Sequence, residues 1–155
     1  MRPISYVQPD PEAWLGKFRF SIPIKPRYFE TDMFGHVNNI SYFIYFEQGR
    51  VEYLESLGLG ERLFNDRNAS VVADLECQYL AQVFKKDKLS LKVRVAKLGR
   101  SSFDLEYALV DAETGRLKAT GRGAMVYIDK QSGKSEPLPD DVKRKIAAFE
   151  ETEMA

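Results

Sequence analysis

The chain has 155 residues, enough for one compact domain with a single hydrophobic core. Lysine plus arginine equals aspartate plus glutamate at 23 each, so no overall charge draws the protein to nucleic acid or to an anionic membrane. The single cysteine, Cys77, excludes an internal disulfide framework, and no apolar run approaches the ~18 residues that span a bilayer. Residues 1–17 also lack a signal-peptide core, so we expect a cytoplasmic protein in which Cys77 is a packed thiol.

The first half of the chain predicts an arm, a strand and one long helix. Residues 1–16 form the N-terminal arm, and residues 17–26 alternate apolar and polar side chains as a half-buried strand does. Pro23 and Pro26 lack a backbone donor, which places that strand at a sheet edge. About twenty residues of helix follow, because Asn38 or Asn39 can cap the start and Gly58 or Gly60 the end.

The second half predicts a run of strands with turns between them. Successive strands of this kind connect by hairpins into an antiparallel sheet, against which the single helix packs. The expected architecture is therefore α+β, with one domain over residues 17–135 and a tail or short helix over 136–155. The four strands are expected at 70–80, 88–98, 102–111 and 117–129.

Two charged residues interrupt the apolar side of the predicted helix. At ~100° per residue, Glu47 and Arg50 fall inside the apolar arc. A buried carboxylate is costly unless it is paired, so one interpretation is that these two residues, three apart, satisfy each other. The other is that Glu47 faces a cleft and positions a water or a catalytic group; the two are compatible. The residues of this arc are Ile40, Phe43, Ile44, Val51, Leu54 and Leu57.

The loop before the helix carries the candidate chemistry. The sole histidine, His36, follows Asp32 by four residues, and the loop leads directly into the helix start. A helix start offers unpaired amides that suit a developing oxyanion, and a nearby carboxylate can attack a carbonyl or activate a water. A carboxylate beside free helix-start amides is an arrangement that can catalyse acyl transfer. Equally, Asp32 and the asparagines are typical caps, and Gly35 is typical of a turn.

The segment from Arg27 to Arg50 resembles the signature of the 4-hydroxybenzoyl-CoA thioesterase family and of related acyl-carrier-protein thioesterases. It contains the pattern D-x-x-G-H-V-N-N-x-x-Y-x-x-Y-x-E-x-x-R, and the resemblance extends to roughly Asp129. It implies the hot-dog fold, a five-stranded antiparallel sheet wrapped around one long central helix. It also implies a homodimer, or a dimer of dimers, with active sites between subunits.

The resemblance assigns roles to the loop. Asp32 matches the catalytic carboxylate, acting as nucleophile or as general base, and Asn39 marks the helix start whose backbone amide binds the thioester oxygen. His36 matches a histidine of the carrier-protein branch, and Glu47 a helix acid. Phe34 stands where that branch commonly has asparagine, so His36 is either a catalytic partner or a support for the loop.

The family binds CoA through basic surface side chains. The candidate here is Arg100 in its turn with Ser101 and Ser102, and Gly35 and Tyr42 complete the expected substrate-binding set. The substrate is then an acyl-CoA or acyl-carrier-protein thioester, with either a fatty or an aromatic acyl group. CoA is part of that substrate and no separate cofactor is expected. One histidine and one cysteine give no metal-ligand cluster.

The sequence thus predicts a thioester hydrolase, and two other functions remain open. One is a hot-dog hydratase or dehydratase of enoyl or hydroxyacyl thioesters; those enzymes usually place Asp and His one residue further apart, with Asn-Pro between them. The spacing of Asp32 and His36, with Gly35 between, favours hydrolysis. The other is a non-catalytic acyl-thioester binding module, against which the presence of both Asp32 and Glu47 argues.

Overall fold

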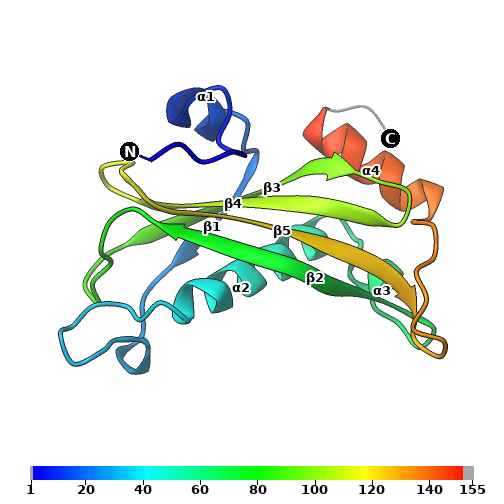
Figure 1. The fold of residues 1–155 in the computed structure, drawn as a ribbon, viewed down its shortest axis with the longest axis horizontal. Coiled ribbons are helices and arrows are strands. Elements are labelled where there is room, and N and C mark those ends of the chain that lie inside the picture. Colours follow the sequence, from blue (N-terminus) through cyan, green and yellow to red (C-terminus); the bar gives the residue numbers. More distant parts are fainter. Residues whose placement is uncertain (1, 152–155) are drawn as a thin grey trace.

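The computed structural model describes residues 2–151, which form one five-stranded antiparallel sheet with helices on both sides (Figure 1). Along the sheet the strands lie in the order β1-β3-β4-β5-β2. No helix within residues 2–151 is long and apolar enough to cross a bilayer. The strands are β1 (Phe20–Ile24), β2 (Asn68–Tyr79), β3 (Leu89–Leu98), β4 (Ser102–Asp111) and β5 (Leu117–Asp129). The helices are α1 (Pro11–Leu15), the 3-10 turn η1 (Tyr28–Glu30), α2 (Ser41–Ser56), α3 (Gly60–Leu63) and α4 (Asp140–Glu150).

The predicted α+β architecture is confirmed, with one correction to the connections. β3, β4 and β5 are joined as hairpins, and β1 is an edge strand as its prolines predict. β2, however, pairs with β5 at the opposite edge and not with β3, its successor in the chain. Hairpin pairing needs only a local turn, whereas this placement depends on contacts between distant segments that the local sequence does not encode. The result is the hot-dog arrangement of a sheet around α2.

The buried face of α2 differs from the predicted one. Ile40, Ile44 and Val51 are 66%, 43% and 41% exposed, whereas three tyrosines of the helix are buried. Tyrosine buries a large apolar ring when its hydroxyl finds a partner, and here the hydroxyl groups of two of them donate to carboxylates. The buried residues of α2 are Ser41, Tyr42, Tyr45, Phe46, Gly49, Arg50, Tyr53 and Leu54.

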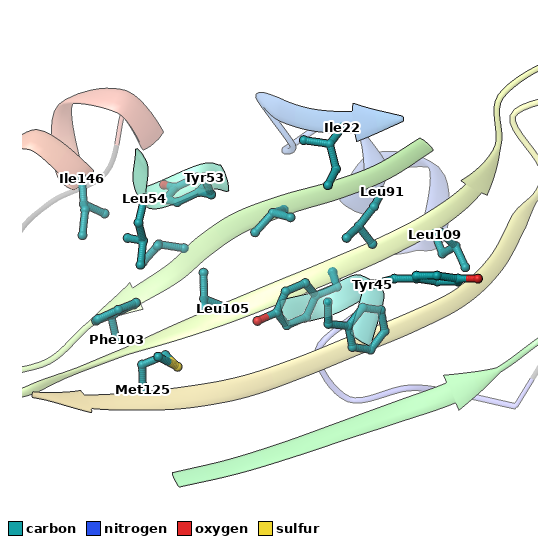
Figure 2. Close-up of a cluster of buried hydrophobic side chains, with 14 of the residues drawn as sticks. Ile22, Tyr45, Tyr53, Leu54, Leu91, Phe103, Leu105, Leu109, Met125 and Ile146 are labelled. Carbon is teal, nitrogen blue, oxygen red and sulfur yellow. The ribbon is translucent and has the colours of Figure 1, made fainter. Parts of the chain in front are cut away.

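A single core fills the space between α2 and the sheet. Tyr45 and Leu54 of the helix point toward Leu91 and Leu105 of the sheet (Figure 2). The helix comes close enough that a Cβ atom on Gly49 would lie 2.5 Å from Leu91 Cδ2, so a larger residue here would force the Leu91 side chain to move. α2 ends at Ser56 with Leu57 as its C-cap; Gly58 then takes φ +71°, and the Leu59 N–H donates back to the Leu54 carbonyl.

Helix α4 covers an edge that β1 leaves open. β1 pairs with β3 only from Leu89 to Val93, so the later part of β3 has no strand beside it on that edge. Glu150 at the end of α4 fills this place: its Oε2 accepts from the Val95 N–H at 2.8 Å and from the Tyr53 hydroxyl at 2.5 Å. The free backbone group of an edge strand is therefore satisfied by a side chain, which prevents strand pairing there.

The N-terminal arm covers part of the sheet face opposite α2 (Figure 1). It contains the short helix α1, which the sequence did not predict, and Asp10 caps that helix through the Ala13 N–H. Trp14 is fully buried, and its Nε1–H donates at 2.8 Å to Glu106, which also pairs with Arg94. The arm is thus anchored to the sheet by a buried aromatic ring and by its hydrogen bond to a carboxylate of β4.

Candidate active site

Asp32 lies in the exposed loop between η1 and α2, and its carboxylate organises the turn. Oδ1 accepts hydrogen bonds from the backbone N–H groups of Phe34 at 2.9 Å and His36 at 3.2 Å. Gly35 allows the turn because it takes φ +79°, a conformation that side chains disfavour. Oδ2 accepts no hydrogen bond from the residues that the structure describes. One oxygen is therefore fixed by the loop and the other remains available for chemistry.

The start of α2 presents free backbone donors beside this carboxylate. Ile40 is the N-cap residue, and Asn38 braces the first turn, because its Oδ1 accepts from the Ser41 N–H at 2.9 Å and from the Ser41 hydroxyl at 3.0 Å. Within residues 2–151, the N–H groups of Asn39 and Ile40 donate to no protein acceptor. The Asn39 carbonyl accepts from the Tyr79 hydroxyl at 2.8 Å, which ties the helix start to the end of β2. Unpaired amides at a helix start suit an anionic oxygen.

A pocket of about 550 Å³ joins these parts. Its wall includes Asp32, His36, Asn39 and Tyr42, and its other side is formed by Tyr79 with residues 80–83. The Tyr42 ring packs edge-on against Tyr79 with centroids 4.8 Å apart, and burial raises the pKa of Tyr42 to about 12, so its hydroxyl stays neutral at physiological pH. The structure thus brings Asp32, His36, Asn39 and Tyr42 together around one pocket.

His36 contacts aromatic rings in this loop. Its imidazole packs edge-on against Phe84 with centroids 4.8 Å apart and lies 6.4 Å from the Phe34 ring. Its main chain bridges to Phe84 and donates to Asp32. The imidazole donates no hydrogen bond to Asp32 in the described structure; the two residues are linked by the His36 N–H, which donates to Asp32 Oδ1, and by the Asp32 N–H, which donates to the His36 carbonyl at 2.8 Å.

Glu47 lies outside the pocket, and its predicted burial is wrong. Its side chain is 67% exposed and lies 3.5 Å from Arg50, whose side chain is 11% exposed. The reason is the rotation of α2 already described: the side with Ile40 and Ile44 faces outward, and Glu47 lies on it. The pairing interpretation of Glu47 and Arg50 is therefore the one that this geometry supports.

The turn with Arg100, Ser101 and Ser102 lies far from Asp32 in the same chain. His36 bridges to Phe84, just before β3, whereas Arg100 follows the end of β3. β3 has 10 residues, and at about 3.3 Å per residue its ends are roughly 30 Å apart. The loop and the turn accordingly lie at opposite ends of the molecule (Figure 1). A single chain does not bring all the predicted site residues together.

Sequence reasoning missed two parts of the site. Residues 80–83, which form one wall of the pocket, carry no motif, and only their spatial position reveals them. Glu30 was also missed: it is 1% exposed and holds the loop through Arg27 and Tyr45. An acid two residues before Asp32 looks like any surface acid in the sequence, although its spacing from Arg27 lets the Glu30 side chain accept from the Arg27 N–H at the start of η1. Cys77 is partly buried against the core, and this burial raises the pKa of its thiol to about 12.

A five-stranded sheet wrapped around one helix is the arrangement of the hot-dog thioesterases. The chain matches the model of the thioesterase-like superfamily over residues 27–146, and it belongs to that family. It is 35% identical to protein YsmA of Bacillus subtilis over 92% of this chain and 95% of that protein. It is 30% identical to acyl-CoA thioesterase YbgC of Haemophilus influenzae over 84% of this chain and 93% of that protein. The structure of a Thermus thermophilus thioesterase, crystallised with coenzyme A and zinc, matches with a TM-score of 0.75 and 29% identity. The match covers 88% of this chain and 98% of that one.

Proposed function

We propose that this protein is an acyl-CoA thioesterase that hydrolyses its substrate at the pocket between Asp32 and the start of α2. One observation carries the proposal: among the described residues, Asp32, whose Oδ2 is unpaired, and Asn39, whose N–H is unpaired, line the same pocket. Membership of the thioesterase-like superfamily and the likeness to an acyl-CoA thioesterase support the same reaction.

The proposed reaction divides its work between these groups. The thioester carbonyl oxygen accepts from the amides of the helix start, where negative charge develops as the carbonyl carbon becomes tetrahedral. Asp32 either takes a proton from the attacking water or attacks the carbonyl itself, after which water cleaves the resulting anhydride. In both routes one water is consumed, and the products are a carboxylic acid and a free thiol. Tyr42 and Tyr79 supply apolar surface for the acyl group.

A homodimer would complete the site. β2 is a 12-residue edge strand, and Val71 and Val72 on it are 41% and 42% exposed. The outward side of α2, with Ile40 and Ile44, adds further exposed apolar surface. A long apolar edge of this kind favours pairing with another strand. If two copies of β2 pair antiparallel about a two-fold axis, Arg100 of the partner subunit approaches the Asp32 loop, where it can bind the phosphates of CoA.

The activity is tested by measuring thiol release with a thiol-reactive dye over short, long and aromatic acyl-CoAs. We expect release above the uncatalysed rate for at least one acyl class, and the preferred class then identifies the acyl group. Acyl-carrier-protein substrates with the same acyl groups separate the two carriers. Hydration of crotonyl-CoA without thiol release would instead indicate a hydratase, and binding without turnover a non-catalytic module.

The dimer predicts that a charge on the free edge of β2 separates the subunits. Val72→Glu places a carboxylate in the proposed strand pair, where it would lose its water, so we expect a monomer by light scattering and loss of most activity. Val126→Glu is the matched control, because Val126 lies on β5 inside the sheet and is only partly buried. A wild-type protein that is monomeric while active would contradict the dimer.

A further inference from the structure

Glu30 is a buried carboxylate whose oxygens are saturated by hydrogen bonds. It is 1% exposed, at the last position of the 3-10 turn that precedes Asp32. Oε1 accepts from the Arg27 N–H and from the Tyr45 hydroxyl, each at 2.8 Å. Oε2 accepts from Arg27 Nε at 3.1 Å and from Nη2 at 2.8 Å. Four donors from two residues therefore hold one side chain.

These contacts connect the loop to the helix. Tyr45 lies on the buried face of α2, about one turn after the helix start, whereas Glu30 lies two residues before Asp32. The main chain reinforces the link, because the Glu30 carbonyl accepts from the Asn38 N–H at 2.8 Å and Thr31 bridges to Val37. The proposed catalytic carboxylate and the proposed oxyanion donors thus belong to one segment, which the hydrogen bonds of Glu30 hold against α2.

The tip of the loop has little packing of its own. Asp32, Met33 and Phe34 are exposed, with Met33 at 90% and Phe34 at 75%. Burial alone would raise the pKa of Glu30, but the hydrogen bonds from Arg27 and Tyr45 outweigh it, so the pKa is lowered and the carboxylate is charged at neutral pH. A charged, fully bonded anchor below an unpacked tip is suited to fixing the position of Asp32.

We propose that Glu30, held by Arg27 and Tyr45, is a positioning residue that sets Asp32 against the start of α2. The inference rests on the proposed hydrolysis and adds the residues that make its geometry rigid. Glu30 does not line the pocket that contains Asp32, so it acts through Asp32 and not on the substrate. Displacement of a reacting group by about 1 Å can lower a rate about 100-fold, which is the size of effect that such an anchor controls.

The test is Glu30→Gln, assayed with the acyl-CoA that wild-type protein hydrolyses. The amide would place an NH2 group against the donors of Arg27 and break at least two of the four hydrogen bonds. We expect kcat to fall by about 10- to 100-fold with KM nearly unchanged, because the substrate contacts remain. Tyr45→Phe removes one donor and keeps the ion pair, so it should fold as wild type and lower kcat by about 3- to 10-fold.

Glu106→Gln is the matched control. Glu106 is also buried, at 8% exposure, and is held by Trp14 and Arg94 on the sheet face opposite α2. Its substitution should lower Tm as Glu30→Gln does and leave kcat unchanged. In an Asp32→Asn background, adding Glu30→Gln should lower the residual rate no further, because an anchor for Asp32 has nothing left to position.

Two results would overturn the assignment of Glu30: a wild-type kcat in both Glu30→Gln and Tyr45→Phe, or a further loss of rate when Glu30→Gln is added to Asp32→Asn. An equal fall of kcat in Glu106→Gln would show that general destabilisation, and not positioning, lowers the rate. Failure of the proposed function is distinct, because wild-type protein itself would then release no thiol from any acyl-CoA.

Discussion

Asp32→Asn is expected to lower kcat for acyl-CoA hydrolysis by about 100- to 10,000-fold, the range that a general base or carboxylate nucleophile contributes. The fold should survive, because the Asn side-chain oxygen can still accept from the Phe34 and His36 N–H groups that now bond to Oδ1. Only the unpaired oxygen, which the amide nitrogen replaces, loses its function. Thiol release and Tm measured on the same sample separate chemistry from stability.

Asp111→Asn is the control for this result. The Asp111 carboxylate also accepts from two backbone N–H groups of a turn, those of Glu113 and Thr114, but it lies outside the pocket. Its substitution should leave kcat as it is. Wild-type turnover in both Asp32→Asn and Asp32→Ala would exclude Asp32 as the catalyst and would point to another group in the pocket.

Phe46→Ala is expected to lower the free energy of unfolding by about 3–5 kcal/mol. Phe46 is fully buried and stacks on Tyr107 with ring centroids 4.5 Å apart, at the centre of the contact between α2 and the sheet. Its removal leaves a cavity that the rigid sheet below cannot close. Urea denaturation followed by circular dichroism at fixed protein concentration measures the change.

Phe64→Ala provides the comparison, because Phe64 follows α3 and is 43% exposed. The free energy of unfolding of the Phe64→Ala variant should differ from that of the wild type by about 1 kcal/mol or less. An equal loss in the two variants would mean that the contact between α2 and the sheet is not where stability is concentrated.

The strands were predictable because each one carries its own signal. β3 and β4 alternate apolar and polar residues, and turns at Gly115 and Gly133 take positive φ as such glycines commonly do. The helix after Pro139 also forms, as α4. The position of β2 at the far edge was not predictable, because the residues of a strand reveal its periodicity but not which strand lies beside it.

The orientation of α2 shows where hydropathy alone misleads. Ile44 and Val51 look like core residues, and Tyr45 and Tyr53 look less apolar, yet the tyrosines are buried because Glu30 and Glu150 accept from their hydroxyl groups. Those acids lie 15 and 97 residues away in sequence, so the local pattern could not reveal the pairing. The aliphatic face marks a second surface, which the proposed dimer would use.

The candidate site was predictable for the loop and not for its supports. Asp32, His36 and Asn39 fall within eight residues, and local turn chemistry fixes their relation. Glu30 and residues 80–83 join the site only through packing between separate segments. Arg100 lies at the other end of the protomer, so its predicted role requires a second chain.

The two edges of the sheet differ in whether a strand of another chain can pair with them. One edge is closed, because β1 is short and contains Pro23, and Glu150 occupies the Val95 N–H beyond it. Only β2 is available, so each copy can accept one neighbour through strand pairing. If two copies pair through β2, as proposed, each uses its one available edge, and growth stops at a closed pair instead of continuing as a fibre.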